Sequence, residues 1–373
     1  MKICHLTSAH NNNDTRIFYK ECVSLAKKYD IYMVARGGSR EEKGVHVIGV
    51  GEAPDNRLKR AISFADKVVS KGIEIDADVY HLHDPELLRF VDRLKKKGKI
   101  VIFDSHEDTL HQMREKTYIP KTFRGLFADS YTKYATRIFS KCDFLVTVTP
   151  TVYEDLKNIN PHTFMVTNYP FIPEVTDYPD DRHRKIDNHK LKLCFTGGLT
   201  KQWNHERFSR VIRSIPECEY VLCGKTDEEY IEYLNELSGG KVRYLGKVSP
   251  PEAVSVQKQC DVGIALLLPS LNSVGMTGTL GNTKMFEYMS SGIPVICTKF
   301  DLWKDIIDKY DCGICVDPYS DKEIRDAVKT LKNNPEKRLR MGKNGVKAVL
   351  QEYNWNTQEK ELFNLYEMAE KQI

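Results

Sequence analysis

The chain has 373 residues, which is longer than one usual domain and long enough to bury two hydrophobic cores. Its composition, with 41% hydrophobic and 29% charged residues, is that of an ordinary globular protein and excludes a disordered or low-complexity chain. The formal net charge is only +4, and we expect no nucleic-acid partner.

No apolar run approaches the roughly 18–20 residues that a membrane span needs, so we expect a cytoplasmic protein. The ten cysteines lie mostly inside apolar runs, as expected for buried thiols in a reducing compartment. Cys312 and Cys315 have the spacing of a redox or metal motif. Because no second Cys or His pair lies near them, packing is the preferred interpretation.

Short apolar runs alternate with segments of helical periodicity from the start of the chain, which is typical of parallel sheets flanked by helices. The strands predicted in the first half are residues 2–7, 31–35, 45–50, 79–83, 100–104, 144–149 and 164–167. In such sheets ligands bind beyond the carboxyl ends of the strands. The chemistry of this chain is therefore expected in the loops that follow these runs.

The loop after the first strand contains Asp14 and Arg16. Arg16 is a candidate for holding an anionic group of an acceptor, and capping of the next helix by Asp14 is an equally good account of the pair. His81 and His83 end the strand 79–83, and His83 is expected to face the ligand cleft. This His-x-His pair could bind a metal, but no partner at ligand spacing follows, so no metal site is predicted.

The strand 100–104 runs directly into a cluster of titratable side chains that includes His106 and Glu107. Its position at the carboxyl end of a strand favours a functional role over surface decoration.

Residues 111–141 form a basic stretch with aromatic and apolar side chains interleaved. Its basic members are Arg114, Lys116, Lys121, Arg124, Lys133, Arg137 and Lys141, against the acidic Glu115 and Asp129. Such an amphipathic stretch can contact an anionic membrane surface or an anionic acceptor. A solvated helix face explains the pattern equally well.

Residues 173–190 lack apolar periodicity and are rich in Pro, Asp and His, so we predict a linker there, after an acceptor-side domain over 1–172. A second strand series follows at residues 191–195, 220–223, 242–245, 262–267, 295–298 and 313–316. The predicted fold class is α/β, with two Rossmann-like domains facing each other across a cleft. The second, nucleotide-sugar-binding domain is placed at 191–352.

The segment from Gly278 to Gly292 contains the richest chemistry of the second domain. Gly278 and Gly281 permit a close backbone approach, Asn282 or Thr283 can cap a helix over about residues 283–291, and Gly292 before Pro294 suits its end. The helix N-terminus and the charge of Lys284 suit a diphosphate. Glu287 shares a helix face with Lys284 and can accept both hydroxyls of a ribose. A simple exposed helical pair is the competing interpretation.

The string over residues 282–296, Asn-Thr-Lys-Met-Phe-Glu-Tyr-Met-Ser-Ser-Gly-Ile-Pro-Val-Ile, resembles the donor motif of the family 4 retaining glycosyltransferases, whose members have the GT-B fold. The resemblance implies that Glu287 binds the donor ribose and that Lys284 lies at the diphosphate. Residues 101–108 resemble a second segment of that family, which implies that His106 lies beside the transferred sugar. The resemblance extends to residues 353–373, implying a C-terminal helix that crosses back onto the first domain.

Two positions depart from the family's pattern. The family commonly has a Glu where this chain has Thr279, so backbone N–H groups around residues 279–282 are expected to contact the sugar instead. The first strand of its second domain usually ends in Gly-Arg-Leu, whereas here Gly197 is followed by Gly198. Lys201 is the nearest substitute for the missing arginine, and the more distant Arg207 and Lys225 are alternatives.

The resemblance implies a metal-independent transfer, with retention, of a sugar from a nucleotide diphosphate sugar, for preference a UDP-sugar, to a glycan or lipid-linked acceptor. Cell-surface polysaccharide assembly is the expected context, and no cofactor is expected. The alternatives are a sugar-nucleotide epimerase of the same fold and a nucleotide-sugar-binding protein without catalysis. A dehydrogenase is disfavoured because the loop after the first strand lacks Gly-x-Gly-x-x-Gly.

Overall fold

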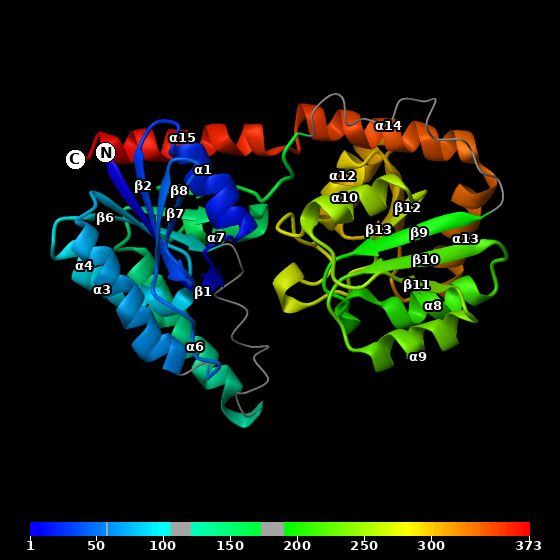
Figure 1. Ribbon diagram of the computed structural model, residues 1–373, viewed down its shortest axis with the longest axis horizontal. Coiled ribbons are helices and arrows are strands. Elements are labelled where there is room, and N and C mark those ends of the chain that lie inside the picture. Colours follow the sequence, from blue (N-terminus) through cyan, green and yellow to red (C-terminus); the bar gives the residue numbers. More distant parts are fainter. Residues whose placement is uncertain (57–58, 106–120, 173–189) are drawn as a thin grey trace. The chain divides into compact units, whose positions relative to one another are not determined.

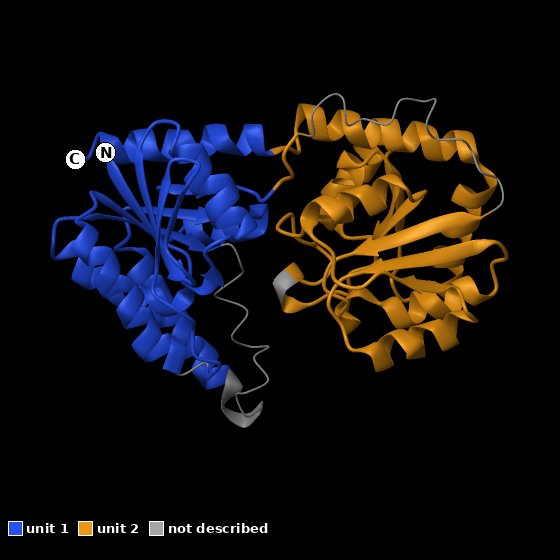
Figure 2. Ribbon diagram, in the orientation of Figure 1, with its two compact units in different colours: residues 1–168, 355–373 blue, residues 169–354 orange. Residues whose placement is uncertain are grey.

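The computed structural model describes residues 1–56, 59–105, 121–172 and 190–373. They divide into two compact units (Figure 2): unit 1 contains Met1–Asn168 and Trp355–Ile373, and unit 2 contains Tyr169–Asn354. The boundary between the two units therefore lies between Asn168 and Tyr169, slightly before the predicted end of the first domain at residue 172. Nearly all of the predicted linker, residues 173–189, lies outside the described part of the chain.

Unit 1 is built on an eight-stranded sheet of order β3-β4-β2-β1-β5-β6-β7-β8. The strands are β1 (Lys2–Asn11), β2 (Asp30–Arg36), β3 (Arg40–Glu42), β4 (Val45–Gly49), β5 (Val79–Leu82), β6 (Ile100–Ser105), β7 (Phe144–Thr147) and β8 (Thr163–Met165). Neighbours pair in parallel, except that β3 pairs antiparallel with β4 at the edge. The sequence did not predict β3, because its three charged residues carry no apolar pattern.

The helices of unit 1 cover both faces of this sheet (Figure 1). They are η1 (Thr15–Cys22), α1 (Val23–Leu25), η2 (Arg60–Phe64), α3 (Ala65–Ile75), η3 (Pro85–Phe90), α4 (Val91–Lys95), α6 (Lys121–Phe139), α7 (Pro150–Lys157) and α15 (Trp355–Glu370). Alternation along β1 divides the core: Ile3 packs with residues of η1 and α15, while Leu6 packs with residues of α3. His5 shares the face of Ile3, which lies beneath η1 and α15.

Unit 2 is built on a six-stranded, all-parallel sheet of order β11-β10-β9-β12-β13-β14. The strands are β9 (Leu191–Thr196), β10 (Cys218–Cys223), β11 (Val242–Tyr244), β12 (Val262–Ala265), β13 (Val295–Thr298) and β14 (Gly313–Val316). The helices are η5 (Lys201–Trp203), α8 (His205–Arg213), α9 (Glu228–Ser238), α10 (Pro250–Lys258), η6 (Leu271–Ser273), α11 (Lys284–Ser290), α12 (Asp301–Tyr310), α13 (Asp321–Asn333) and α14 (Pro335–Gln351).

The predicted α/β class with two Rossmann-like domains is confirmed, since each unit is a largely parallel sheet with a separate hydrophobic cluster on each face. All ten cysteines belong to the described residues and are unpaired, and nine of them are buried. Within the described ranges, no helix combines the length and the apolar character that crossing a bilayer requires.

Candidate functional site

Two glycines in unit 2 bring the loops after β9 and β10 together. Gly197 follows β9 with φ 151°, and Gly224 follows β10 with φ 145°. A Cβ atom on Gly224 would overlap the carbonyl oxygen of Gly197, so this packing requires glycine. A Cβ atom on Gly197 would lie 2.7 Å from Cε of Lys284. The structure thus places the loop after β9 directly against the lysine of the motif at 282–296.

Lys284 and Glu287 form an oriented pair on α11. The Lys284 Nζ atom donates to Glu287 Oε2 at 2.8 Å, and Thr283 Oγ1 donates to Glu287 Oε1 at 2.6 Å. The Lys284 side chain is 19% exposed and that of Glu287 30%, so both are held by the fold while remaining reachable. A simple solvated pair would have neither the second donor nor the packing against Gly197.

The loop before α11 uses its side chains to bond its own backbone. Asn282 Oδ1 accepts from the backbone N–H of Lys284 at 3.2 Å, and Thr279 Oγ1 accepts from that of Gly281 at 3.0 Å. Thr283 precedes the helix, but its hydroxyl bonds Glu287 instead of capping. The backbone N–H groups of Gly281 and Lys284 are therefore engaged inside the loop in this structure.

Buried contacts fix α11 to the sheet behind it. Met285, Phe286, Tyr288 and Met289 are all fully buried. Tyr288 Oη accepts from the backbone N–H of Thr196 at 3.2 Å, and a Cβ atom on Gly263 would overlap the Tyr288 ring. Because Thr196 ends β9 and Gly263 lies in β12, the tyrosine seats the helix on two adjacent strands. This seating determines where Lys284 and Glu287 project.

Two of the three basic residues proposed as substitutes for the missing arginine, Lys201 and Arg207, line a second feature of unit 2. A cavity of about 260 Å³ is lined by Lys201, Asn204, Glu206, Arg207, Arg210, Leu268 and Tyr319. Lys201 is exposed, while Arg207 pairs with Asp321 and donates to the Tyr319 carbonyl oxygen. Gly198, which stands where the family has its arginine, has open space where a side chain would be. The Arg207 guanidinium is thus already bound by protein partners, whereas the Lys201 side chain is exposed.

At the carboxyl edge of unit 1, Asp14 does cap the next helix. Its Oδ1 atom accepts from the backbone N–H groups of Arg16 at 2.8 Å and Ile17 at 2.9 Å. Its Oδ2 atom lies 3.2 Å from His10 Nδ1. Burial raises the pKa of Asp14, but the hydrogen bonds from His10 and from these N–H groups outweigh it and lower the pKa to about 2.

His10 was not singled out by sequence, although it is partly exposed beside Asp14 and Asp84. Its Nε2 atom lies 3.5 Å from Asp84 Oδ1. Burial lowers the pKa of His10. The hydrogen bond to Asp14 and the negative charge of Asp84 raise this pKa by more than burial lowers it, so the net shift is upward. The signal available in the sequence was that residues 10 and 84 both follow strands predicted to lie in the same sheet.

The structure corrects the predictions for Arg16 and His83, both of which face the interior. Arg16 is 6% exposed, and it donates to both carboxylate oxygens of Asp104, at 3.0 and 3.1 Å, and to the Val166 carbonyl oxygen at 2.8 Å. These buried partners leave no place for an anionic acceptor group. His83 is fully buried, with Nε2 2.9 Å from His5 Nδ1. It therefore does not face a ligand cleft.

His83 belongs to a buried cluster that sequence reasoning missed. His5, Glu21, His81 and His83 are all fully buried, and one possible ligand atom from each lies within 4.8 Å of those of the others. The sequence showed His81 and His83 as a pair, but the remaining two residues come from a different strand and from η1. The predicted site residues His106 and Glu107 lie outside the described residues.

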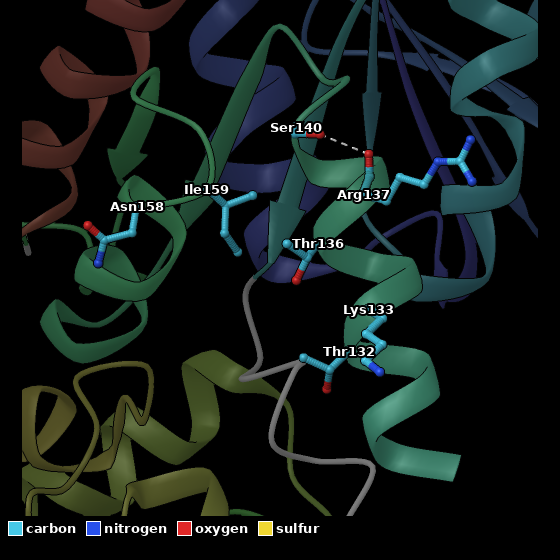
Figure 3. Close-up of a pocket in the computed structure, with 7 residues that line it drawn as sticks. All are labelled: Thr132, Lys133, Thr136, Arg137, Ser140, Asn158 and Ile159. Carbon is cyan, nitrogen blue, oxygen red and sulfur yellow. Dashed lines mark hydrogen bonds between the residues drawn. The ribbon is translucent and has the colours of Figure 1, made fainter. Parts of the chain in front are cut away.

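A surface cavity of about 530 Å³ opens on unit 1 beside α6 (Figure 3). It is lined by Thr132, Lys133, Thr136, Arg137, Ser140, Asn158 and Ile159. The first five come from α6 and the residue after it, within the basic stretch 111–141. This cavity contains none of the predicted catalytic or donor-binding residues, so we do not assign the chemistry to it.

Comparisons with known proteins agree with the fold and the motif at 282–296. Residues 179–348 match the model of the family described as glycosyl transferases group 1. A D-inositol 3-phosphate glycosyltransferase of Corynebacterium glutamicum is 28% identical over 157 residues, which are 40% of this chain and 35% of that protein. A phosphatidyl-myo-inositol mannosyltransferase of Mycobacterium leprae is 24% identical over 342 residues, covering 86% of this chain and 83% of that protein.

Two solved structures share the whole architecture. Sucrose-phosphate synthase from Thermosynechococcus elongatus superposes with a TM-score of 0.78 at 14% identity, covering 99% of both chains. Anabaena HepE, in complex with UDP and glucose, gives a TM-score of 0.70 at 13% identity, covering 99% of this chain and all of the other. Fold and site thus define a GT-B protein. Residues 179–348 of this chain are similar to the group 1 glycosyltransferases.

Proposed function

We propose that this protein transfers a sugar from a nucleotide diphosphate sugar to an acceptor hydroxyl, with retention at the anomeric carbon. The observation that carries this proposal is the Lys284–Glu287 pair, which is oriented by Thr283 and held against Gly197 at the carboxyl edge of the unit 2 sheet. Ligands of doubly wound sheets bind at this edge. The match of residues 179–348 to the group 1 family supports the proposal.

Lys284 would stabilise the leaving group of the reaction. As the glycosidic bond breaks, negative charge builds on the departing diphosphate, and a fixed ammonium group lowers the energy of that state. The lysine has three N–H donors, so it can keep its bond to Glu287 and still reach a phosphate oxygen. The charge of Lys284 is the reason that we propose a reaction without a metal ion or cofactor.

Glu287 would bind the ribose of the donor. Hydrogen bonds from Thr283 and Lys284 fix the orientation of its carboxylate, and a carboxylate held in this way can accept from the two hydroxyls of a ribose. We propose UDP as the nucleotide, because a protein of the same fold has been crystallised with UDP. Lys201 is the residue that we propose for the phosphate contact which the absent arginine makes elsewhere in the family.

The proposed acceptor is a glycan or a lipid-linked sugar at an anionic membrane surface, as in cell-surface polysaccharide assembly. The described part of α6 supports this, because Leu126 is 71% and Phe127 50% exposed, and the exposed Lys133 and Arg137 lie further along the same helix. Apolar side chains next to basic ones suit contact with anionic lipid. The relative from Mycobacterium leprae is named for a phosphatidyl-inositol acceptor. We propose a cytoplasmic, peripherally bound protein.

Turnover of a panel of nucleotide sugars tests the proposed function. We expect Lys284→Ala and Glu287→Ala each to lower kcat/KM for the active donor by about 10²-fold or more while the protein stays folded, since each removes a contact to the charged leaving group or its ribose. Lys304→Ala is the matched control, because Lys304 forms an exposed helical pair with Asp308 on α12 of the same unit. Full activity in both site variants would refute the assignment.

A further inference from the structure

The unit 1 sheet gathers three histidines on one face. His5 of β1 and His81 of β5 are register partners in a parallel pair, and His83 follows two residues later. Because side chains alternate along a strand, all three imidazoles lie on the face covered by η1 and α15. Glu21 of η1, a π-helix of a kind often found at functional sites, lies against them. None of the four side chains has any solvent exposure.

The distances between the ligand atoms are those of a small metal ion's coordination shell. His5 Nδ1 and His83 Nε2 are 2.9 Å apart, and Glu21 Oε2 lies 3.9 Å from the first and 3.8 Å from the second. With His81 included, the four ligand atoms all lie within 4.8 Å of one another. Ligands about 2.0–2.1 Å from a tetrahedral Zn²⁺ are roughly 3.3 Å apart, so only small side-chain adjustments are needed.

Each histidine has its other ring nitrogen anchored by a polar neighbour. Tyr366 Oη lies 2.8 Å from His81 Nδ1 and 3.3 Å from His5 Nε2, and Asp104 Oδ2 lies 3.3 Å from His83 Nδ1. Such outer hydrogen bonds orient metal-binding imidazoles and select the tautomer that leaves the opposite nitrogen free.

Glu21 is oriented in the same way. Arg16 Nε lies 3.1 Å from Glu21 Oε1, which leaves Oε2 as the oxygen facing His5 and His83. The carboxylates of Glu21 and Asp104 would offset two of the three positive charges that a divalent ion and Arg16 bring together.

The cluster contains buried polar atoms that lack hydrogen-bond partners. Among the described residues, His81 Nε2 and both carboxylate oxygens of Glu21 have no hydrogen-bond partner. The two oxygens make only the ion-pair contacts given above. Leaving such atoms unsatisfied in a dry interior is costly.

We propose that His5, Glu21, His81 and His83 bind one Zn²⁺ ion in a closed, four-coordinate structural site within unit 1. All four positions of the ion would be filled by protein, which leaves none for a substrate or a reactive water. The ion would join β1, β5 and η1, and through Tyr366 it would stabilise the packing of α15. The proposal does not depend on the donor site of unit 2.

Metal analysis of the tag-free, full-length protein tests this proposal first. After incubation with Zn²⁺ and desalting we expect one zinc per chain by mass spectrometry, and after exchange with Co²⁺ we expect the intense visible absorption of four-coordinate cobalt. Chelation of the metal should lower the thermal midpoint of unit 1, because an ion that binds only the folded state stabilises it. Less than stoichiometric zinc, or the weak spectrum of six-coordinate cobalt, would overturn the proposal.

The chain offers a matched control for the ligand variants. His205 in unit 2 is also fully buried, with Nδ1 2.9 Å from Tyr220 Oη and Nε2 without a hydrogen-bond partner, and the cluster found around His81 does not include it. We expect His81→Phe to lose the zinc and His205→Phe to retain it. Equal zinc contents in the two variants would contradict the assignment.

Conservative variants keep the test valid if His81→Phe fails to fold. Tyr366→Phe removes one outer hydroxyl and should weaken zinc binding about 10–100-fold, whereas Tyr220→Phe, beside the control histidine, should leave it unchanged. Glu21→Gln removes the charged ligand and should abolish stoichiometric binding. Unchanged zinc affinity in both Tyr366→Phe and Glu21→Gln would show that these residues form a metal-free buried network.

Discussion

The contact between Gly197 and Lys284 joins two motifs that lie far apart in the chain. The sequence suggested a role for each, but their relation comes from the loop after β9, whose backbone passes against the Lys284 side chain. A Cβ atom at residue 197 would displace the end of the Lys284 side chain, and φ 151° is itself unfavourable for residues other than glycine. Gly197 therefore acts on the candidate site by positioning the lysine.

We predict that Gly197→Ala weakens binding of UDP and of the active UDP-sugar about tenfold or more, because the new methyl group displaces the Lys284 ammonium. Isothermal titration calorimetry measures the change. Gly240→Ala is the control, since Gly240 also has a positive φ, 82°, in unit 2 but has open space around its Cα atom. If both variants weaken binding equally, general backbone strain and not the position of Lys284 is responsible.

Arg16 and His83 show how burial changes the meaning of a residue. Both follow strands of the unit 1 sheet at positions where ligands are expected, yet both are covered by other elements. Arg16 pairs with Asp104 inside the unit, and His83 lies against His5. His10 and Asp14 remain partly exposed at this edge. These are the residues that we would vary first in a search for acceptor contacts.

At the scale of single elements, η1 depends on its cap. The helix starts after Asp14, whose carboxylate accepts two backbone hydrogen bonds, and it carries Arg16 and Glu21 into the interior. Its eight residues, Thr15–Cys22, form a π-helix, a geometry that costs stability and usually persists because its surroundings support it. The cap and the buried ion pairs together supply that support.

We predict that Asp14→Ala destabilises unit 1 by about 1 kcal/mol at pH 7, the usual cost of removing a capping side chain. The folded-state pKa of Asp14, about 2, lies below its unfolded value of about 3.9, so its contribution is present above that value and is lost as the pH falls towards 2. The difference between variant and wild type, followed by chemical denaturation, should therefore shrink below pH 4.

Ser320→Ala is the matched control for this experiment. Ser320 caps α13 in unit 2 by accepting from the backbone N–H of Glu323, and a hydroxyl does not titrate in this range. Its destabilisation should be similar in size and should not vary with pH between 2 and 5. A pH-independent loss in Asp14→Ala would show that the carboxylate does not stabilise the helix through its charge.

At the scale of the whole molecule, the chain builds unit 1, then unit 2, and then returns to finish unit 1 with α15. Trp355 begins that helix, is 1% exposed, and donates from Nε1 to Ser24 Oγ at 2.9 Å. Tyr366, further along the helix, lies beside His5 and His81. The buried face of α15 is therefore part of the core of unit 1.

We predict that Trp355→Phe lowers the stability of unit 1 alone, by roughly 1–3 kcal/mol, because it leaves a cavity and removes the bond to Ser24. Trp303→Phe should act on unit 2 alone, since Trp303 is buried there and donates to the Thr279 carbonyl oxygen. Differential scanning calorimetry, with UDP added to raise the unit 2 transition, separates the two effects. A loss of stability in both units from either variant would contradict this assignment.

Sequence periodicity was sufficient for the fold class and most strands, because buried parallel strands are short apolar runs between helices in any such protein. The exception was β3, whose three charged residues pair with β4 at the edge of the sheet and bury little of their surface. Local pattern was also sufficient for α11, whose spacing puts Lys284 and Glu287 on one face. These features depend on neighbours in the chain.

Only the tertiary structure decided which polar residues are buried and which lie together. The contact of Gly197 with Lys284, the burial of Arg16, and the meeting of His5, Glu21, His81 and His83 all join separate elements. The physical reason is that hydrogen bonding and desolvation depend on what covers a side chain. For the face of β1 and β5, part of that cover comes from α15, at the opposite end of the chain.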